Sequence, residues 1–482
     1  MYISKVILEN YKGYSGIHTF NFNKGVNYFV GNNNCGKSTV FEAIEFIKTK
    51  KSKEDTITKN SIGEVSVTVE FRGDVEEAVK NSGLSKYESY LVDDDGEKVI
   101  TLQRSSKQDE IVQNKKPKTL SIKDVRVYNE TSKQFENPTG VDKTIGALFE
   151  TQFIWADTNP NDVSDFGSTK ICGRLVMGAA QDFYKSPQWT AFKEVHRDTF
   201  TKGKDSLSAK VKPLESKLQE IITEQYGDTE VKFDFSLPDV ASFTKSGTIK
   251  MIDNEIETDS SEKGTGMQRA LALALIQVYA DTLTKVGAEE AKSKPLLFFI
   301  DEPETFLHPK AQDKLMKAFE KISSSSQVFI TTHSPYLLKK YSPKDHSLTV
   351  FSKTSSGNKA DPSSSLGLFG ASSPTWGEIN YFAFDFATVE FHNELYGFAE
   401  ARAKLNDSSI VNQKDFDDYL EALGCSKNKT WTRSTSSSYA TTIQNYIRNS
   451  IHHPENKLNT EYTGEELQTS IEEFLTLNIP LI

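Results

Sequence analysis

The spacing of apolar residues predicts β-strands in the first third of the chain. Apolar positions two residues apart, the period of a half-buried strand, occur at Val6/Leu8 and Phe20/Phe22. The mostly apolar run 26–30 (VNYFV) predicts a buried strand, and helical spacing begins directly after it in 39–47 (TVFEAIEFI). A further strand is predicted at 63–73, and a hairpin at 88–103 that turns at Asp95-Gly96.

The pattern becomes helical from about residue 176 to 226. In the segment 206–227, apolar residues recur every three or four positions, at Leu207, Val211, Leu214, Leu218 and Ile221. This run is too short for a coiled coil, so we expect a short helical arm. Beyond residue 350, helical patterns at 374–405, 415–424, 437–456 and 463–475 predict an all-helical C-terminal domain. Thr463 and Glu466 form a capping box before the last of these helices.

Composition places the chain among ordinary soluble proteins. Of its 482 residues 37% are hydrophobic and 26% charged, and no apolar run approaches the length of a membrane span. Three cysteines without paired spacing fit a reducing, cytoplasmic location. A net charge of −10 disfavours a general nucleic-acid coat protein. A local basic patch could still bind nucleic acid, and the candidates are Lys48, Lys50, Lys51, Lys53, Lys115, Lys116 and Lys118.

A phosphate-binding loop lies between the strand at 26–30 and the helix that follows it. The residues Gly31, Asn32, Asn33, Asn34, Cys35, Gly36, Lys37, Ser38 and Thr39 have the spacing G-x-x-x-x-G-K-[ST] of Walker A. Glycines let backbone N–H groups turn toward an anion, and the helix N-terminus favours negative charge. Lys37 is expected to contact the β- and γ-phosphates of ATP, and the Ser38 hydroxyl to bind Mg²⁺.

A second motif supplies the carboxylates that such a site needs. The apolar run 296–300 ends in Asp301-Glu302, which is the Walker B arrangement. We expect Asp301 to hold Mg²⁺ and Glu302 to activate the attacking water.

Two shorter features complete the set of motifs expected at an ATP site. A glycine turn, Gly264-Thr265-Gly266, opens a helical pattern as a further anion site, and His333 ends the strand predicted at 328–332.

Together these segments resemble the OLD/RecF-like branch of ABC-type ATPases. The resemblance rests on the opening IxKVxLENYK, on GNNNCGKST, on KGTGMQRALALAL, on IDEPETFLHP and on TTHSPYLL, and covers about residues 1–350. It implies an α/β ATPase head with an inserted lobe and helical arm at about 55–255, followed by a helical domain at 351–482. It also implies that His333 contacts the γ-phosphate and that Gln152 is a candidate for the family's Q-loop glutamine.

The same resemblance implies how the chain works. Two subunits would enclose ATP between Walker A of one and Gly264–Gly266 of the other, so at least a homodimer is expected. Members of this branch include ATPases of anti-phage systems such as Septu and Gabija. We therefore expect a sensor or switch subunit that gates a separately encoded nuclease, since the Toprim nuclease motifs of OLD nucleases are not found in 350–482. A RecF-like clamp for DNA repair is the alternative.

One motif in the C-terminal domain leaves a third interpretation open. Arg448 and His453 have the spacing R-N-x-x-x-H of HEPN-type ribonucleases, which suggests an RNase that the ATPase restrains within one chain. Imidazole titrates near neutrality and guanidinium matches phosphate geometry, so the chemistry is plausible. Basic residues are also common at a helix C-terminus, and Pro454 ends a helix at this point. We favour the helix-end interpretation.

Overall fold

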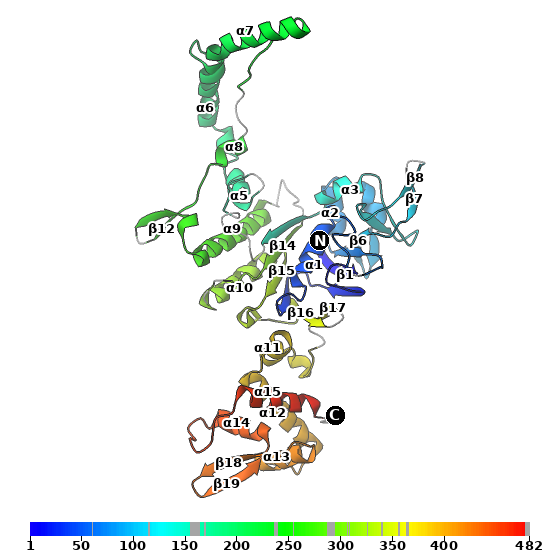
Figure 1. Cartoon of the computed structure of the whole chain (residues 1–482), viewed down its shortest axis with the longest axis vertical. Coiled ribbons are helices and arrows are strands. Elements are labelled where there is room, and N and C mark those ends of the chain that lie inside the picture. The colour runs from blue at the N-terminus through cyan, green and yellow to red at the C-terminus, as the bar shows by residue number, and fades with distance from the viewer. Residues whose placement is uncertain are drawn as a thin grey trace. The chain divides into compact units, whose positions relative to one another are not determined.

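The computed structural model divides the chain into two compact units, Met1–Ala156 with Ala291–Ile482 and Asp157–Glu290 (Figure 1). The structure describes residues 1–59, 61–113, 116–154, 164–167, 170–235, 240–253, 255–286, 295–305, 307, 309–324, 326–338, 341–354, 357–362 and 366–477. Lys115, one of the lysines predicted to form a basic patch, lies outside them. In the described part of the chain, no helix combines the length and apolar character that crossing a membrane requires.

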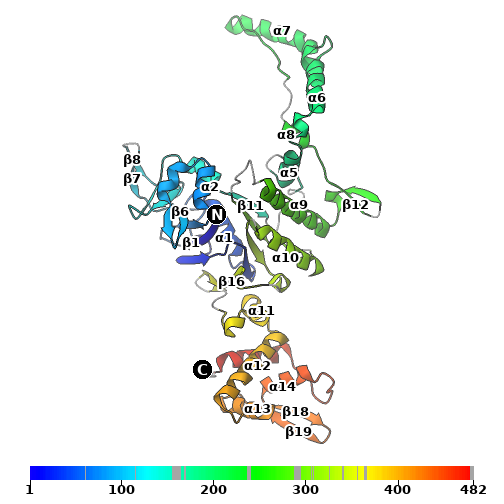
Figure 2. The ribbon, with the colours of Figure 1, turned by 180° about the vertical axis from the view of Figure 1, so that it is seen from behind.

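A mostly parallel sheet forms the centre of the first unit (Figure 2). Its strand order is β11 (Glu150–Ile154), β14 (Leu296–Asp301), β15 (Gln327–Thr332), β3 (Val26–Gly31), β16 (His346–Thr354) and β17 (Gly357–Pro362). All neighbours are parallel except the edge pair β16–β17. Every residue of β3, β14 and β15 is buried, as expected for parallel strands covered on both faces. Their carboxyl ends therefore meet at one edge, where α/β proteins bind ligands.

An antiparallel sheet completes the predicted head. It contains β10 (Gln134–Glu136), β9 (Arg126–Asn129), β6 (Glu97–Ser105), β4 (Ser66–Arg72), β1 (Tyr2–Glu9) and β2 (Ile17–Asn21), in that order, with β5 (Val92–Asp94) paired to β6. The hairpin predicted at Asp95-Gly96 is confirmed, and both turn residues have positive φ. The other elements of this part are α2 (Val75–Asn81), β7 (Glu110–Gln113), β8 (Lys116–Thr119) and α3 (Val141–Thr144).

The helix after the phosphate loop, α1 (Lys37–Phe46), belongs to a core that includes residues of both sheets. Successive side chains of β3 point to opposite faces of the sheet, so this strand packs against two helices. The Phe29 ring lies 5.4 Å from Phe41 of α1, whereas the hydroxyl of the adjacent Tyr28 lies 3.6 Å from the Met316 sulfur of α10 (Pro309–Ser323). The two helices thus cover opposite faces of the sheet. The predicted α/β P-loop head is confirmed.

Two predicted boundaries differ from the structure. Strands β4 to β10 were expected within an inserted lobe at 55–255, but they extend the sheet of β1, because β4 pairs with β1 along most of its length. The compact unit inserted in the head is Asp157–Glu290 instead. The head also does not end at 350, since β17 pairs with β16 through Pro362.

The inserted unit is mainly helical. Its elements are α5 (Ile171–Ala179), α6 (Pro187–Arg197), α7 (Leu207–Tyr226), α8 (Val240–Thr244), β12 (Lys250–Asp253), β13 (Ile256–Asp259) and α9 (Thr265–Val286). Helix α7 is the predicted arm. It begins after Ser206, whose side chain accepts from the backbone N–H of Ala209, and it ends before Gly227. Arg174 of α5 donates to the Tyr279 hydroxyl of α9, which joins these two helices.

The described residues of the C-terminal region form five α-helices, α11 (Trp376–Phe384), α12 (Val389–Asn406), α13 (Gln413–Ala422), α14 (Ile443–His452) and α15 (Gly464–Thr476). The helical character and the capping box before α15 are confirmed. The expected single helix over 374–405 is two helices, because Asp385 adopts the left-handed conformation and Thr388 caps α12. The region is also not all helical, since β18 (Lys429–Ser434) and β19 (Ser437–Thr441) form a hairpin.

Candidate nucleotide-binding site

The phosphate loop joins β3 to α1 at the carboxyl edge of the parallel sheet. Its glycines are required by close packing. Gly31 has a φ of 138°, and an added Cβ would lie 2.1 Å from the carbonyl oxygen of Phe351. Gly36 has a φ of 94°, and an added Cβ would lie 2.7 Å from the Tyr14 hydroxyl, which itself donates to the Gly36 carbonyl. Only glycine fits these positions without strain.

Lys37 lies inside the curve of this loop. Its ammonium donates to the carbonyl oxygens of Gly31 at 3.0 Å and Asn32 at 2.9 Å, and the residue is 6% exposed. Burial lowers the pKa of Lys37, while Cys35 and the nearby carboxylates oppose that shift. The loop thus holds a cation beside the N-terminus of α1, and both features favour the binding of phosphate.

Ser38, in the first turn of α1, contacts Asp301, at the end of β14. The strand that precedes α1, β3, is separated from β14 by β15. The Ser38 hydroxyl donates to Asp301 Oδ1 at 2.8 Å, and Thr331 of the intervening strand β15 donates to the same oxygen at 2.5 Å. These hydroxyl and carboxylate oxygens are the hard ligands that Mg²⁺ prefers, and Mg²⁺ commonly takes one or two protein ligands beside substrate phosphates. The two residues therefore fit the predicted metal site.

Glu302 is held in an unusual backbone conformation. Its φ is 46°, and its N–H is directed to the Thr331 carbonyl at 3.1 Å and to the Thr331 hydroxyl at 3.0 Å. A left-handed conformation is costly for glutamate, so the surrounding contacts must fix it. The result is that Glu302 Oε1 lies 3.1 Å from His333 Nε2, in the middle of the site.

His333 contacts both Lys37 and Glu302 through one ring nitrogen. Nε2 lies 3.0 Å from Lys37 Nζ and 3.1 Å from Glu302 Oε1. An imidazole nitrogen accepts from Lys37 when unprotonated or donates to Glu302 when protonated, so it cannot serve both at once. Burial, followed by the charge of Lys37, lowers the pKa of His333, although Glu302 opposes this shift. A neutral ring is therefore favoured, and it accepts from Lys37 in the tautomer that carries its proton on Nδ1.

Sequence reasoning missed Glu304. Its Oε1 accepts from the backbone N–H of His333 at 2.7 Å and from the Thr332 hydroxyl at 2.8 Å. Burial raises the pKa of Glu304, and its other oxygen is buried without a hydrogen-bond partner among the described residues. This carboxyl group fixes the end of β15, from which His333 projects. The only signal in the sequence is an acidic residue two positions after Glu302, which does not reveal the contact.

The remaining predicted residues lie as follows. Cys35 is buried and donates to the Asn32 carbonyl, and burial raises the pKa of its thiol. Asn33, Asn34 and Thr39 complete the loop and the first turn of α1. Gln152 lies within β11, level with Phe298 and three residues short of the level of Asp301 in β14. The residues after β11 are outside the described ranges.

The glycine segment belongs to the inserted unit. Gly264 precedes α9, and its carbonyl accepts from the N–H groups of Met267 and Gln268, so Thr265 and Gly266 form the first turn. A Cβ added at Gly264 would meet no described atom within 4 Å. The glycine is therefore not required by packing within the described chain.

Arg448 and His453 lie at the end of α14. The Arg448 guanidinium donates to Gln413 Oε1 at 3.3 Å, and its centre is 6.0 Å from the Tyr396 ring. His453 is the residue that ends the helix, and its Nδ1 lies 3.2 Å from Glu455 Oε1. This placement is compatible with both interpretations of the motif.

Comparison with known proteins agrees with this geometry. Residues 1–338, more than half of the chain, match the model of the AAA ATPase domain family. The chain belongs to this family. It is also 27% identical over 331 residues to the Old nuclease of Escherichia phage P2, a match that covers 64% of this chain and 53% of that protein. The chain thus spans about half the length of this relative.

Solved structures of SMC heads are also similar. The SmcHead bound to the C-winged helix domain of ScpA matches with a TM-score of 0.42 and 14% identity, over 75% of this chain and 97% of that one. The SMC head domain from Thermotoga maritima matches with a TM-score of 0.36 and 13% identity, over 75% and 99%.

Proposed function

We propose that this ATPase is the nucleotide-driven switch of an anti-phage system and gates a separately encoded nuclease. The observation that carries the ATPase part is the cluster of Lys37, Ser38, Asp301, Glu302 and His333, which contact one another at one edge of the parallel sheet. The defence role rests on the resemblance to the OLD/RecF-like branch and on the likeness to a phage nuclease over about half of that nuclease's length.

Each residue has a distinct part in hydrolysis. Lys37 exchanges the carbonyls of Gly31 and Asn32 for oxygens of the β- and γ-phosphates. Once Lys37 binds the phosphates, the His333 tautomer that carries the ring proton on Nε2 instead of Nδ1 donates toward Glu302 or the γ-phosphate. Glu302 accepts a proton from the attacking water. Ser38 and Asp301 hold Mg²⁺, which when bound neutralises charge developing on the phosphates.

The glycine segment would act across a dimer. Gly264–Gly266 lie at the N-terminus of α9, which is the positive end of its helix dipole. Helix N-termini of this kind bind phosphate. The open space around a Cβ at Gly264 supports this assignment, because close approach of another molecule is a second reason for glycine. We propose that Gly264–Gly266 of one subunit contact the γ-phosphate held by the loop of the other.

Mixing two inactive variants tests this arrangement. Lys37→Ala removes the phosphate contact, and Gly264→Asp places a negative charge where the γ-phosphate would lie. Aspartate is a preferred residue before a helix, so the second change should not disturb folding. The mixture should recover about a quarter of wild-type turnover, since half of random dimers contain both variants and each keeps one of two intact sites. Absence of recovery, with each variant folded, would exclude the shared site.

The defence role has its own test. The chain carrying Glu302→Gln should retain ATP, and a tagged copy recovered from its native cells should co-purify with a nuclease. Lys37→Ala should abolish protection when cells are challenged with phage. The purified chain alone should not cut DNA with Mg²⁺ or Mn²⁺. DNA cleavage by the pure chain would contradict a separate effector, and tight ATP-dependent binding of duplex DNA at physiological salt would favour the repair clamp.

A further inference from the structure

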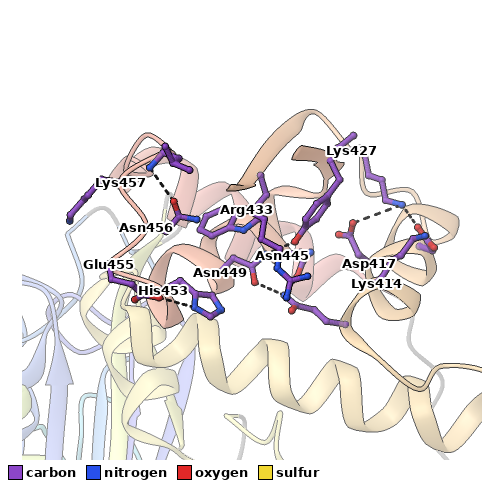
Figure 3. A pocket seen from close by; sticks show the side chains of 16 residues that line it. Lys414, Asp417, Lys427, Arg433, Asn445, Asn449, His453, Glu455, Asn456 and Lys457 are labelled. Carbon is purple, nitrogen blue, oxygen red and sulfur yellow. Dashed lines mark hydrogen bonds and ion pairs between the residues drawn. The ribbon is translucent and has the colours of Figure 1, made fainter. Parts of the chain in front are cut away.

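The C-terminal region contains a cavity of about 910 Å³ that the ATPase does not use (Figure 3). It is lined by α13, by the hairpin β18–β19, by α14 and by the loop 453–458. Its volume is within the range of small-molecule sites. Its lining is rich in amides, cations and aromatic rings, which distinguishes it from an apolar packing defect.

Buried amides form the floor. Asn445 and Asn449 are each 2% exposed and lie one turn apart on α14. Gln413 Nε2 donates to Asn449 Oδ1 at 2.6 Å and also to Asn445 Oδ1. Asn445 Nδ2 donates to the Thr441 hydroxyl at 2.7 Å. A connected network of this kind fixes each amide in one orientation, so its donors and acceptors are held at defined positions.

The hairpin supplies aromatic rings on one wall. Trp431 and Tyr439 are directly opposite in the β18–β19 register, so both side chains lie on the same face of the hairpin. The Tyr439 side chain is 42% exposed, and its hydroxyl accepts from Asn449 Nδ2 at 3.3 Å. The register shifts between Thr432 and Ser434, which places Arg433 in a bulge. Bulges commonly redirect a side chain beside a functional site.

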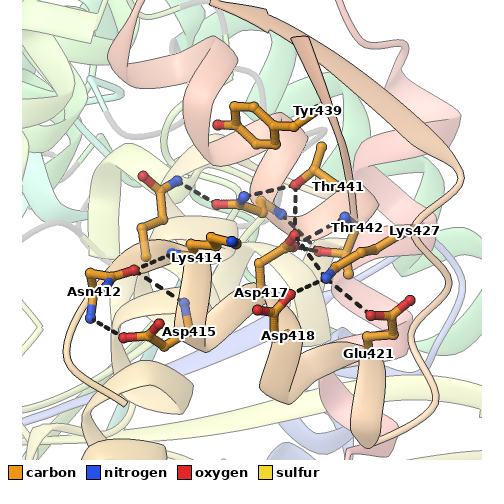
Figure 4. Close-up of polar contacts among 12 residues, drawn as sticks. Asn412, Lys414, Asp415, Asp417, Asp418, Glu421, Lys427, Tyr439, Thr441 and Thr442 are labelled. Carbon is orange, nitrogen blue, oxygen red and sulfur yellow. Dashed lines mark hydrogen bonds and ion pairs between the residues drawn. The ribbon is translucent and has the colours of Figure 1, made fainter. Parts of the chain in front are cut away.

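Some of the charged residues around the cavity form ion pairs and others do not. Lys427 is bound by three carboxylates, with Nζ 3.8 Å from Asp417, 3.0 Å from Glu421, and in contact with Asp418 (Figure 4). By contrast, none of the lining cations Lys414, Arg433 and Lys457 forms an ion pair with another described residue. Three exposed cations from three segments thus surround an opening in which the single charge of Lys427 offsets only part of the charge of Asp417 and Asp418.

We infer that this cavity binds a nucleotide, either free or within a single-stranded nucleic acid. Fixed amides match the hydrogen-bonding edges of a base, an exposed tyrosine beside a tryptophan offers a ring to stack on, and unpaired cations attract a phosphate. A simple anion would not need the amides and rings, and an apolar ligand would not need the cations. The site is separate from the phosphate loop and does not depend on the proposed function.

Binding is measured on the full chain with Lys37→Ala, so that the phosphate loop does not contribute. The probes are nucleoside 5′-monophosphates by calorimetry and fluorescein-labelled single-stranded RNA and DNA hexamers by anisotropy. Arg433→Gln and Lys414→Gln should each weaken binding about tenfold, a typical loss for one charge-assisted hydrogen bond. Lys404→Gln is the matched control, because it removes an exposed cation of α12 that does not line the cavity. Tyr439→Ala should weaken binding more than Tyr439→Phe.

The outcomes distinguish a free nucleotide from a nucleotide within a single-stranded nucleic acid. Binding of monophosphates supports a free nucleotide, and binding of hexamers alone supports single-stranded nucleic acid. The inference is overturned if no probe binds, if inorganic phosphate competes as well as a nucleotide, or if Arg433→Gln and Lys414→Gln bind like Lys404→Gln. Lys414 and Arg433 are exposed, so their variants should fold, and circular dichroism checks this.

Discussion

The phosphate loop of the head and the cavity of the C-terminal region would both bind a phosphate-bearing ligand, but they are built differently. The loop is a short contiguous segment whose glycines and backbone N–H groups would supply most of the contacts to phosphate. Two carbonyls of the loop hold Lys37. The cavity draws side chains from four segments between residues 413 and 458, and its amides are fixed by one another. A backbone site tolerates almost no added side chain at its glycines. A side-chain site should lose affinity gradually, one contact at a time.

The largest effect should come from the residue that supports the head site indirectly. Glu304→Ala leaves the part-buried N–H of His333 without its acceptor, a free-energy cost of about 1–3 kcal/mol that corresponds to a factor of roughly 5 to 150. We expect turnover of ATP to fall by about that factor while ATP affinity changes little. Glu304→Gln keeps an accepting oxygen and should remain close to wild type. Equal rates for wild type and Glu304→Ala would show that this contact does not position His333.

Acidic pH should lower the stability of the C-terminal region through one buried histidine. His392 of α12 is fully buried beside Ser470, and burial lowers its pKa to about 3. An unfolded histidine titrates near 6.5, so below that pH the unfolded state binds the extra proton and stability falls as the pH falls. At pH 5 the C-terminal region should lose about 2 kcal/mol from this group. Hydrogen exchange of peptides from α12 and α15 measures this loss, and His392→Gln should remove it. Protection factors of these peptides that do not change with pH in wild type would contradict the account.

The smallest effect concerns the motif at the end of α14. If His453 only ends a helix, His453→Ala should lower stability by about 0.3–1 kcal/mol, the usual range for a charge at a helix end. Turnover of ATP should stay at the wild-type rate, because His453 does not contact the head site. Thermal unfolding at pH 6 and an RNA cleavage assay test this together. Metal-independent RNA cutting by wild type that His453→Ala abolishes would establish the ribonuclease interpretation.

The head was largely predictable because its chemistry requires residues at fixed spacing. A phosphate loop needs glycine where backbone approaches backbone, as at Gly31, and its lysine must directly follow a glycine. Parallel strands place Asp301 and His333 at the same edge, so their nearness to the phosphate loop follows from their positions at strand ends. Glu304 could not be assigned in this way, because its role depends on a hydrogen bond to a backbone group 29 residues away.

The antiparallel sheet of the head and the C-terminal cavity were less predictable for a related reason. Strands such as β9 and β10 have only three or four residues, too few for a clear period, and their place in the sheet depends on pairing with distant partners. The hairpin β18–β19 lies in a polar, serine-rich segment and is anchored by one buried tryptophan. The cavity beside it depends on side chains whose spacing follows no motif.

The most direct test of the central claim, that these residues form an ATP-hydrolysing site, compares ATP binding and turnover in wild type and Glu302→Gln. The substitution preserves the shape of the side chain and removes the group that accepts a proton from water. We expect Glu302→Gln to bind ATP with wild-type affinity, to lose multiple-turnover hydrolysis and to accumulate as the ATP-bound oligomer. Hydrolysis by Glu302→Gln at the wild-type rate would contradict the assignment of Glu302 as the base.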